Sequence, residues 1–365
     1  MSNRRVTMRQ IAEVAGVSRT TVSFVLNNVP GINISQETRQ RILDIAQQLH
    51  YVPDTAAQSL ASRRAGTVAL VLRQSPHQVL SDAFLAPVLR GVSDAVKRYG
   101  YHVLVEPLDP VDRSVSYGDL VRSRRADGIL LSGPRLDDEE LPRIYAEHIP
   151  IVMMGQLPGT DIPFVDVDNV RGAWMAVRHL IELGHQRIAI ITNAPLAYTS
   201  SRDRLAGYRQ ALDEAGISCD ESLIQYGDFT DESGALAMHT LLGLASPPTA
   251  VFAASDVVAL GALSAIQAAR LDVPGDIALV GFDDIPLAQY IDPPLTTIRL
   301  PAYGLGWGAG QMLGRLIAER SEVVETQILL ETKLIIRESS GAVAAPHQTQ
   351  PDDLEKEVTT EDQPD

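Results

Sequence analysis

Cysteine is almost absent from this sequence. The single residue, Cys219, cannot form a disulfide within the chain, and one thiol is too little for a cysteine-based metal site. No apolar run is long enough to span a bilayer, and the charged start of the chain, MSNRRVTMRQ, is not followed by the apolar stretch of a secretion signal. These absences predict a protein of the reducing cytoplasm with no membrane segment.

Residue patterns typical of catalysis or metal binding are also missing. No Ser-His-Asp or paired-carboxylate spacing stands out, and Asp283 and Asp284 would face opposite ways as neighbours on a strand. His179 and His185 bracket a helix end without a third ligand, so we interpret both as structural. GLGWGA, residues 304–309, matches a dinucleotide-binding glycine pattern, but no βαβ unit follows it and glycine packing at a helix start explains it better. We therefore expect no enzyme activity, cofactor or metal.

The charge is distributed unevenly along the chain. The net charge is −15 over 365 residues, but residues 1–64 carry eight arginines against four acids, or +4, which leaves −19 for the remainder. A basic head on an acidic body is typical of a nucleic-acid-binding module joined to another domain. Charge alone fits a solvated face as well, so the interpretation depends on the motifs within that head.

Residues 6–50 have the pattern of three short helices. Thr7 with Gln10 forms a capping box at the first helix, and Gly16 ends it. Ser18 caps a second helix after a tight turn, and Ser35 caps a third, SQETRQRILDIAQQLHY. Two short helices joined by a turn that contains glycine predict a helix-turn-helix.

The second of these helices, within VSRTTVSFVLN (17–27), has one apolar and one polar side. At about 100° per residue, Val22, Val25 and Leu26 lie on one face. The opposite face is formed by Thr20, Ser23, Phe24 and Asn27, with Arg19 at the rim. Small polar side chains let a helix enter a DNA groove, and arginine reads guanine. Phe24 either meets a thymine methyl or packs back on its own domain.

A short alanine-rich segment, DTAAQSLASRRAG, follows these helices. Asp54 can cap about two helical turns, and Ala57 and Leu60 share one face. A helix this short is marginal alone in water and needs a partner surface. The segment is either a plain linker or an apolar wedge that unstacks bases in a minor groove.

From residue 67 apolar strand-like runs alternate with amphipathic helices. Seven such runs, from TVALVLR to IALVGFDD, predict parallel sheets with helices on both faces and more than one small sheet. The chain is expected to cross between two lobes at FVDVDNVRGAW and again near PPLTTIRLPAY. The helix GWGAGQMLGRLIAER and a strand ETQILLETKLIIRES complete the body.

The predicted fold class is therefore an all-α N-terminal helix-turn-helix domain followed by an α/β domain of two Rossmann-like lobes with parallel sheets. The expected boundaries are 1–52 for the helix-turn-helix, 53–65 for the hinge helix and linker, 66–340 for the two-lobed domain, and 341–365 for the tail. Lobe 1 comprises about 66–166 and 298–325, and lobe 2 about 167–297 and 326–340. The tail holds seven acids against one lysine and no heptads, which predicts an unfolded acidic segment and not a coiled coil.

Seven motifs together resemble the lactose-repressor (LacI/GalR) family of bacterial transcription regulators. They are VTMRQIAEVAGVSRTTVSFVLN, YVPDTAAQSLAS, HLIELGHQRIAIIT, RDRLAGYRQAL, AASDVVALGAL, VPGDIALVGFDDIPLA and PPLTTIRLP, in family order over about residues 5–340. The resemblance implies a homodimer that acts as a repressor, with a two-lobed sensor like periplasmic binding proteins. A small-molecule effector, sugar-like, then controls its affinity for double-stranded operator DNA allosterically.

The resemblance also implies which residues contact DNA. Arg19, Thr20 and Phe24 match base-reading positions, and Thr21 and Ser23 match positions that contact phosphates. Asn27 lies on the same face, and Ala57 and Leu60 belong to the hinge helix, where Leu60 matches the leucine that wedges into the operator centre. The position of Phe24 is often arginine in the family, so the base it reads differs. A two-fold dimer demands a pseudo-palindromic operator.

The effector site is expected beyond the carboxyl ends of the strands, where ligands bind in open α/β lobes. The residues predicted to line it are Phe84, Tyr198, Ser200, Arg204, Phe229, Ser255 and Asp283, of which the resemblance implies Arg204 and Phe229 as matches to ligand-binding positions of the family. Asp283 ends a strand and can accept hydrogen bonds from two sugar hydroxyls, whereas Asp256 is expected to cap a helix. The alternative for Arg204 is a surface ion pair with Asp203. A sugar or sugar phosphate is the expected ligand class, with a nucleobase or another small metabolite as the alternative.

Two other functions compete with a regulator. An NAD- or sugar-dependent enzyme would use the glycine pattern at 304–309. A solute-binding protein of the transport type would have the two lobes, but with a secretion signal and without a helix-turn-helix. The sequence has a helix-turn-helix and no secretion signal, which is the reverse of what a transport-type protein requires. The enzyme hypothesis rests on a weak match to the glycine pattern.

Overall fold

A computed structural model of the protein describes residues 6–26, 31–51, 64–109, 112, 116–319 and 326–342. The chain divides into two compact units, Met1–Arg64 and Ala65–Asp365. Each unit has a hydrophobic core of its own.

The first unit contains the three predicted helices, α1 (Met8–Ala15), α2 (Arg19–Leu26) and α3 (Gln36–Gln48). The capping box is present: Thr7 Oγ1 accepts from Gln10 N, and Gln10 Oε1 accepts from Thr7 N at 2.8 Å. Gly16 ends α1 at φ 68°, a left-handed conformation that glycine adopts without a Cβ clash. These local signals fix the tight turn that joins α1 to α2.

The three helices enclose a small core. Its buried side chains are Ile11, Ala12, Ala15, Val22, Val25, Ile42 and Ala46. Leu26, Ile45 and Leu49 are partly buried against it. The helical spacing of the sequence therefore identified the inward faces correctly.

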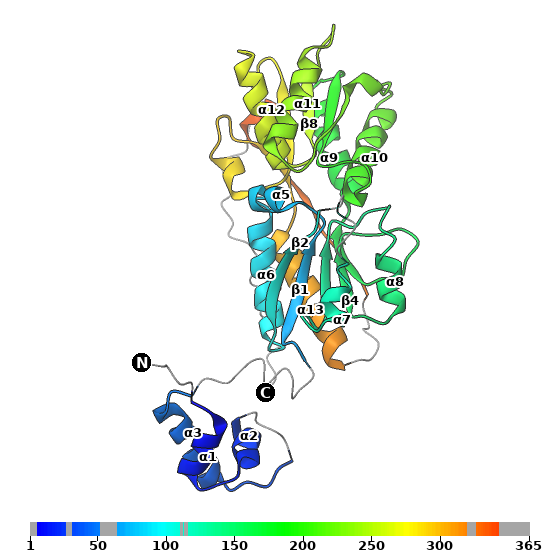
Figure 1. Ribbon diagram of the computed structural model, residues 1–365. Coiled ribbons are helices and arrows are strands. Elements are labelled where there is room, and N and C mark those ends of the chain that lie inside the picture. Colours follow the sequence, from blue (N-terminus) through cyan, green and yellow to red (C-terminus); the bar gives the residue numbers. More distant parts are fainter. Residues whose placement is uncertain are drawn as a thin grey trace. The chain divides into compact units, whose positions relative to one another are not determined.

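The second unit contains two six-stranded sheets, arranged as two lobes one beyond the other (Figure 1). The first sheet has the order β11-β5-β4-β3-β1-β2, with all its pairs parallel. Its strands are β1 (Thr67–Leu72), β2 (His102–Pro107), β3 (Ile129–Ser132), β4 (Ile151–Met154), β5 (Phe164–Val167) and β11 (Gln327–Leu330). Its helices are α5 (Pro76–Ser81), α6 (Leu85–Lys97), α7 (Asp119–Arg122), α8 (Leu141–Ala146) and α13 (Ala302–Glu319).

The second sheet has the order β12-β10-β9-β8-β6-β7. Its strands are β6 (Ile188–Thr192), β7 (Ile224–Tyr226), β8 (Ala250–Ala253), β9 (Ala278–Asp283), β10 (Thr296–Arg299) and β12 (Lys333–Ile335). Only β12 runs antiparallel to its neighbour, β10. Its helices are α9 (Asn169–Glu182), α10 (Thr199–Glu214), α11 (Asp231–Leu242) and α12 (Asp256–Ala268), with short 3₁₀ turns at Glu221–Leu223, Pro286–Gln289 and Glu338–Ser340.

The segment ETQILLETKLIIRES differs from the single strand expected in lobe 2. It forms two strands in different sheets: Gln327–Leu330 pairs in parallel with β5 of lobe 1, and Lys333–Ile335 pairs with β10 of lobe 2. The chain therefore crosses between the lobes after Leu330 and not at residue 326. The apolar run of this segment looks continuous in the sequence. Its first half joins the sheet of lobe 1 because the edge of β5 is free to pair with it. Likewise β10 carries the second sheet to Arg299, slightly past the expected boundary.

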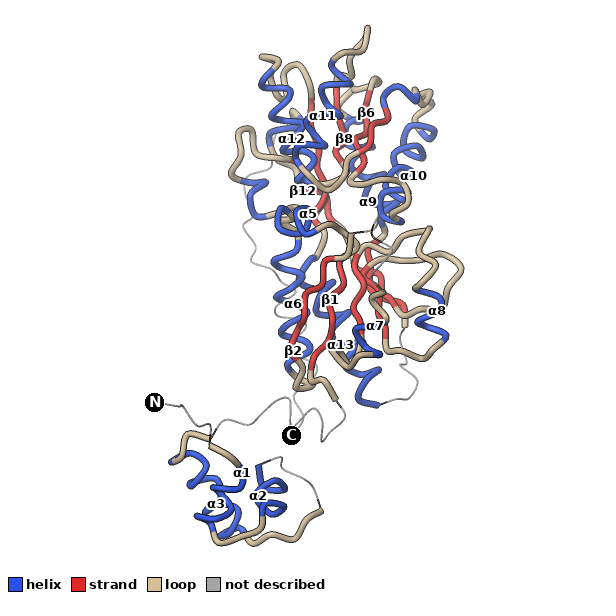
Figure 2. The backbone as a smooth tube through the Cα atoms, viewed as in Figure 1, coloured by secondary structure: helices blue, strands red, loops and turns tan. Residues whose placement is uncertain are grey.

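Helices α6 and α13 lie beside the first sheet and pack against each other at very close range (Figure 2). A Cβ built on Gly306 would lie 2.1 Å from the carbonyl oxygen of Val88, and one on Gly91 would lie 2.2 Å from that of Tyr303. Gly306 of GLGWGA and Gly91 of α6 thus let two helix backbones touch. This supports glycine packing over a dinucleotide-binding loop for residues 304–309, which lie inside α13.

Candidate functional site

Helix α2 presents a polar surface on the first unit. Val22 and Val25 are buried, while Arg19 and Thr20 are exposed and Ser23 is half-exposed. Thr21 is half-buried, and its hydroxyl lies 2.8 Å from Ser18 Oγ, which in turn accepts from Thr21 N at 3.0 Å. The N-terminal end of the helix is therefore ordered by its own cap, and the side chains predicted to read DNA point away from the core.

The position of the Phe24 ring bears on the two roles expected for it, contact with a thymine methyl or packing on its own domain. The ring is half-buried, yet in the described part of this unit it is not among the side chains that pack against the core. This placement favours the outward role over packing back on the domain. Three further predicted DNA contacts, Asn27, Ala57 and Leu60, lie outside the described residues, as does most of the hinge segment.

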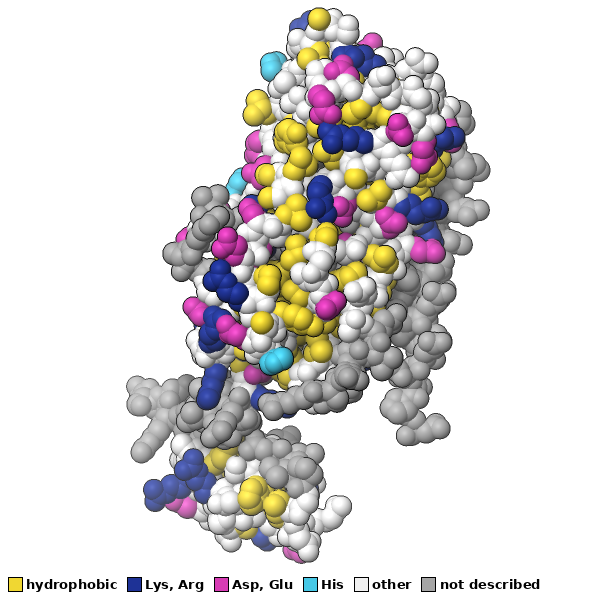
Figure 3. Space-filling view, turned by 90° about the vertical axis from the view of Figure 1, so that its right-hand side faces the viewer, with side chains coloured by type: hydrophobic (Ala, Val, Ile, Leu, Met, Phe, Trp, Pro, Cys, Tyr) yellow, Lys and Arg dark blue, Asp and Glu magenta, His cyan; other side chains and the backbone are white. Residues whose placement is uncertain are grey.

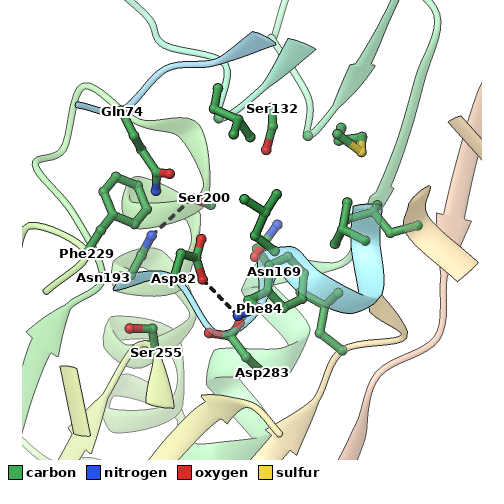
Figure 4. A pocket seen from close by; sticks show the side chains of 18 of the residues that line it. Gln74, Asp82, Phe84, Ser132, Asn169, Asn193, Ser200, Phe229, Ser255 and Asp283 are labelled. Atoms are coloured by element: carbon green, nitrogen blue, oxygen red, sulfur yellow. Dashed lines mark hydrogen bonds between the residues drawn. The ribbon is translucent and has the colours of Figure 1, made fainter. Parts of the chain in front are cut away.

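A cavity of about 120 Å³ lies between the two lobes of the second unit, beyond the carboxyl ends of their strands (Figure 4). It is lined by β1 and the segment before α6 on one side, and by the ends of β6, β8 and β9 on the other. Six of the seven predicted effector residues line it: Phe84, Ser200, Arg204, Phe229, Ser255 and Asp283. Leu300, which directly follows β10, lines it too.

Arg204 organises the floor of this cavity and makes no surface ion pair with Asp203. It is only 5% exposed, its Nε donates to Asn169 Oδ1 at 2.9 Å, and its Nη1 donates to the carbonyl of Ala254 at 2.5 Å. The guanidinium also lies over the Phe282 ring, 3.7 Å from its centre. Its neighbour Arg202 makes the more exposed pair with Asp203 at 3.3 Å.

Asp283 ends β9 beside this guanidinium. Its Oδ1 lies 3.8 Å from Arg204 Nη1. Burial raises the pKa of Asp283 well above its usual range, although the charge of Arg204 acts in the opposite direction. The adjacent Asp284 faces away, as expected, and pairs with Arg299 at 2.7 Å and Arg337 at 2.6 Å.

The capping role predicted for Asp256 belongs to Ser255 instead. Ser255 Oγ accepts from Val258 N at 3.3 Å, at the start of α12. Asp256 is fully buried one residue later, where it accepts from Ile285 N at 2.9 Å and bonds the Thr297 hydroxyl at 2.6 Å. Burial raises the pKa of Asp256 to about 7. The sequence shows two adjacent capping residues, and only the packing of β9 and β10 decides which one turns inward.

Tyr198 is placed behind the cavity and not among the residues that line it. It is 3% exposed, and its ring meets Phe229 edge-on at 4.9 Å between centres. Its hydroxyl donates to the carbonyl of Arg73 in the other lobe. Backbone bonds from Leu136 N to Ala197 O at 2.8 Å and from Thr199 N to Pro134 O at 3.2 Å extend this connection between the lobes.

Several polar residues of the cavity do not follow from the sequence patterns. They are Gln74, Asp82, Asp166, Asn169, Asn193 and Thr199. Asn193 directly follows β6, so the rule that ligands meet strand ends could have found it. Asp166 and Asn169 sit in the FVDVDN crossing, for which the sequence predicts only a connection. Asp82 lies in a loop whose sequence contains no motif that indicates a binding residue.

A larger hollow of about 450 Å³ lies elsewhere in lobe 1, between α7 and α8. Its wall consists mainly of charged side chains that form ion pairs with one another. Arg122 pairs with Glu147 at 2.8 Å, and Arg135 pairs with Asp137 at 2.7 Å. On the face drawn in Figure 3, hydrophobic side chains gather across the middle of the two-lobed unit, with acidic and basic side chains around and among them. Volume alone therefore does not identify the site, and the interlobe cavity remains the better candidate.

The two histidines have ordinary structural partners. His179 Nε2 lies 3.0 Å from Ser340 Oγ, and His185 Nδ1 lies 3.0 Å from Thr249 Oγ1. Across the described residues, no group of three or more His, Cys, Asp or Glu side chains is arranged to hold a metal ion. Among the described helices, none is long and apolar enough to cross a bilayer.

Comparison with known proteins agrees with both units. Residues 7–54 match the family "Bacterial regulatory proteins, lacI family", and residues 177–340 match a periplasmic binding protein-like domain. The transcriptional regulator CelR of Thermobifida fusca is 37% identical over 92% of this chain and 98% of its own. The transcriptional repressor CytR of Escherichia coli K12 is 36% identical over 92% and 97%.

Solved structures give the same result. A CelR–cellobiose complex is 35% identical, with a TM-score of 0.69 over 92% of this chain and all of that one. The lac repressor dimer bound to operator and an anti-inducer is 28% identical, with a TM-score of 0.79 over 92% and 99%. These relatives are named as transcriptional regulators and not as enzymes. The chain therefore belongs to the LacI family of bacterial regulatory proteins, and it is a DNA-binding transcriptional regulator whose helix-turn-helix unit is joined to a two-lobed effector-sensing domain.

Proposed function

We propose that the outward face of α2 reads a pseudo-palindromic operator as part of a homodimer, and that the interlobe cavity binds the effector that controls this binding. The observation that carries the proposal is the cavity between the lobes, with the buried pair of Arg204 and Asp283 at its base. A sugar or sugar derivative is the ligand class. The cellobiose bound to the related CelR supports this choice.

Each DNA contact has a proposed role. Arg19 and Thr20, both exposed, read base edges together with the half-buried Phe24. Thr21 and Ser23 contact phosphates, and these contacts set the register of the helix without selecting sequence. Asn27 extends the same face, and Ala57 and Leu60 act from the hinge segment in the minor groove. A phenylalanine at position 24 offers an apolar contact to a thymine methyl.

The effector acts through the connection between the lobes. Phe84 approaches from lobe 1, and Ser200, Phe229 and Ser255 approach from lobe 2, so a bound ligand bridges the two. Bridging shifts the population toward one interlobe arrangement, which changes how two protomers present their N-terminal units. Effector and operator affinities are then coupled equally in both directions, by about 1–3 kcal/mol in typical cases.

Gel shifts on the DNA upstream of the gene itself test this function. Arg19→Ala and Thr20→Ala are expected to weaken operator binding at least tenfold while leaving affinity for random DNA nearly unchanged. Arg41→Ala removes an equal charge from an exposed position of α3 and is the matched control. If affinities for operator and random DNA fall equally, α2 contacts only phosphates and the base-reading assignment is wrong.

The same assay tests the effector site. A crude sugar mixture is added to the operator complex of the full chain and of Asp283→Ala. The effector response is expected to disappear in the variant, because the carboxylate that ends β9 no longer receives the ligand hydroxyls. An unaltered response in Asp283→Ala would place the effector site elsewhere in the molecule.

A further inference from the structure

The charged side chains that line the interlobe cavity are strongly unbalanced. Three are carboxyl groups, Asp82, Asp166 and Asp283, and one is a guanidinium, Arg204. Asp82 comes from the loop before α6 and Asp166 from β5, both in lobe 1, whereas Asp283 ends β9 in lobe 2. The acids therefore approach the cavity from both lobes, as Figure 4 shows for Asp82 and Asp283.

The single guanidinium is already engaged. Arg204 donates to Asn169 and to the carbonyl of Ala254, and its remaining charge faces Asp283 at 3.8 Å. A ligand anion would have to compete with this carboxylate for the same cation. Arg204 thus pairs with one acid, Asp283. Its charge also acts on Asp166, but neither Asp166 nor Asp82 forms an ion pair with it.

Asp82 and Asp166 are held only by neutral donors. Asp82 accepts from Phe84 N at 2.9 Å, and Asp166 accepts from Gln156 Nε2 at 3.1 Å and Asn169 Nδ2 at 3.3 Å. Among the described residues, neither carboxyl group lies within ion-pairing distance of a basic side chain. Burial raises the pKa of each to about 6, as expected for acids that lack a neutralising partner.

Asn193 gives independent evidence that the ligand of the cavity carries a hydrogen-bond donor. The side chain is 3% exposed and lines the cavity, and its Nδ2 donates to Ser200 Oγ at 3.3 Å. Its Oδ1 is buried with no hydrogen-bond partner in the described structure. A buried acceptor without a partner is costly, so a ligand donor at this point satisfies an existing requirement.

Much of the remaining wall is apolar. Phe84, Phe229, Met154 and Leu300 contribute side chains to it. A ligand that fits has an apolar face for these side chains and hydrogen-bond donors directed at the carboxylates and at Asn193 Oδ1. Pyranose rings and nucleosides both have this combination of an apolar face and donor edges.

We propose that the cavity accepts an uncharged or positively charged ligand rich in hydroxyl or amine donors and rejects phosphorylated and carboxylated ones, with Asp82, Asp166 and Asn193 as specificity-determining acceptors. The inference rests on the proposed function and narrows its ligand class. A sugar phosphate or a sugar acid brings a further anion into a desolvated site that already holds two carboxyl groups without an ion-pair partner. Selectivity thus comes from repulsion of anions as much as from attraction of donors.

Charge fractionation of an extract tests this while the effector is still unidentified. A small-molecule extract of the cells that carry the gene is separated by ion exchange into neutral, cationic and anionic fractions, and each is added to the operator gel shift. Activity is expected in the neutral or cationic fraction. Activity confined to the anionic fraction overturns the inference but leaves the regulator function intact, whereas failure of the free protein to shift operator DNA rejects the proposed function itself.

Variants assign the specificity to particular residues. Asn193→Leu removes the unpartnered oxygen and is expected to raise the extract concentration needed for half response at least tenfold. Asn193→Asp keeps the acceptor and is expected to restore most of the response, which a merely structural role would not predict. Asp161→Asn, at an exposed position, is the control. Equal responses of Asn193→Leu and the unmodified chain overturn the assignment of Asn193.

A ligand-free measurement decides the matter even if no fraction is active. Thermal unfolding of the full chain is compared for Asp82→Asn and the Asp161→Asn control at pH 5 and pH 8. An asparagine keeps the acceptor for Phe84 N but removes the charge. The unfolding midpoint of Asp82→Asn is expected to rise by roughly 2–4 °C at pH 8 and by less at pH 5. A midpoint that is unchanged or lowered at pH 8 means that the carboxylate is compensated, and the inference fails.

Discussion

Arg204 and Asp283 form the polar floor of the interlobe cavity, with Nη1 of the one 3.8 Å from Oδ1 of the other and both side chains at most 10% exposed. The guanidinium also bonds Asn169, the first residue of α9, and the carbonyl of Ala254, which follows β8. One buried arginine therefore connects the start of α9 and the ends of β8 and β9 at the base of the cavity.

Replacement of this arginine is expected to be strongly destabilising. In Arg204→Met, Asn169 Oδ1 and the Ala254 carbonyl lose their donor and Asp283 loses its cation. The free energy of unfolding is expected to fall by about 3–5 kcal/mol at pH 8, as for other broken buried pairs. The loss is smaller at pH 5, because Asp283 can then take up a proton.

Chemical denaturation at the two pH values measures this effect. Arg202→Met is the matched control, because Arg202 sits two residues earlier in α10 with a half-exposed pair to Asp203. An exposed pair of this kind contributes about 0–1 kcal/mol. Equal losses in the two variants would show that the buried floor is not stabilised by Arg204.

Asp256 gives the protein a pH-dependent stability. Its folded pKa of about 7 lies above the ordinary value of 3.8, so this carboxyl favours the folded state fully below about pH 4, and the advantage is lost as pH rises through 7. Asp256→Asn keeps an acceptor for Ile285 N and removes the titration. It is expected to gain stability over the unmodified chain at pH 8 and to lose that gain toward pH 4.

A second substitution separates charge from hydrogen bonding at this position. Asp256→Ala leaves Ile285 N and the Thr297 hydroxyl without their partner, and is expected to be about 2–3 kcal/mol less stable than Asp256→Asn at any one pH. Urea unfolding across the pH series tests both statements. A parallel pH profile for the asparagine variant and the unmodified chain would contradict the assignment.

The glycines of α13 provide a matched pair of substitutions. Gly306→Ala places a methyl group 2.1 Å from the Val88 carbonyl of α6, so the helices must separate. A loss of about 3 kcal/mol is expected, at the upper end for overpacking. Gly304→Ala meets nothing nearer than 3.6 Å and is expected to stabilise the helix by up to about 1 kcal/mol. Thermal unfolding of both variants is the measurement, and similar effects at 304 and 306 would contradict the close crossing.

Tyr198 is expected to influence effector affinity without touching the ligand. Tyr198→Phe removes the hydroxyl that bonds the Arg73 carbonyl across the lobes. The free energy of unfolding is expected to fall by about 1 kcal/mol, and the closed arrangement of the lobes to lose about the same amount. Effector affinity is then expected to fall roughly fivefold.

Tyr99→Phe is the control for this experiment. It removes a comparable hydroxyl bond, to Gln311 Oε1 at 2.9 Å, but within lobe 1. Both variants lose stability, and only Tyr198→Phe is expected to weaken the effector response in the operator assay. A parallel change in Tyr99→Phe would mean that general destabilisation, and not the interlobe bond, lowers the response.

The sequence itself determined the local elements and the class of the fold. The capping box at Thr7, the turn at Gly16 and the helical spacing of Ile11, Ala12 and Ala15 act over a few residues, so they are readable from the chain. The alternation of buried strands and amphipathic helices predicted parallel sheets in two lobes for the same reason. The rule that ligands meet strand ends placed Ser255 and Asp283 at one cavity, and the resemblance to the family added Arg204.

The tertiary structure decided what depends on neighbours distant in sequence. It assigned Gln327–Leu330 to lobe 1 because the edge of β5 was free, turned Asp256 inward where Ser255 was left to cap α12, and moved Tyr198 behind Phe229. It also brought Asp82 and Asp166 into the cavity, which no spacing indicates. Pairing, burial and charge compensation arise only when separate segments meet, and these three effects set the chemistry of the site.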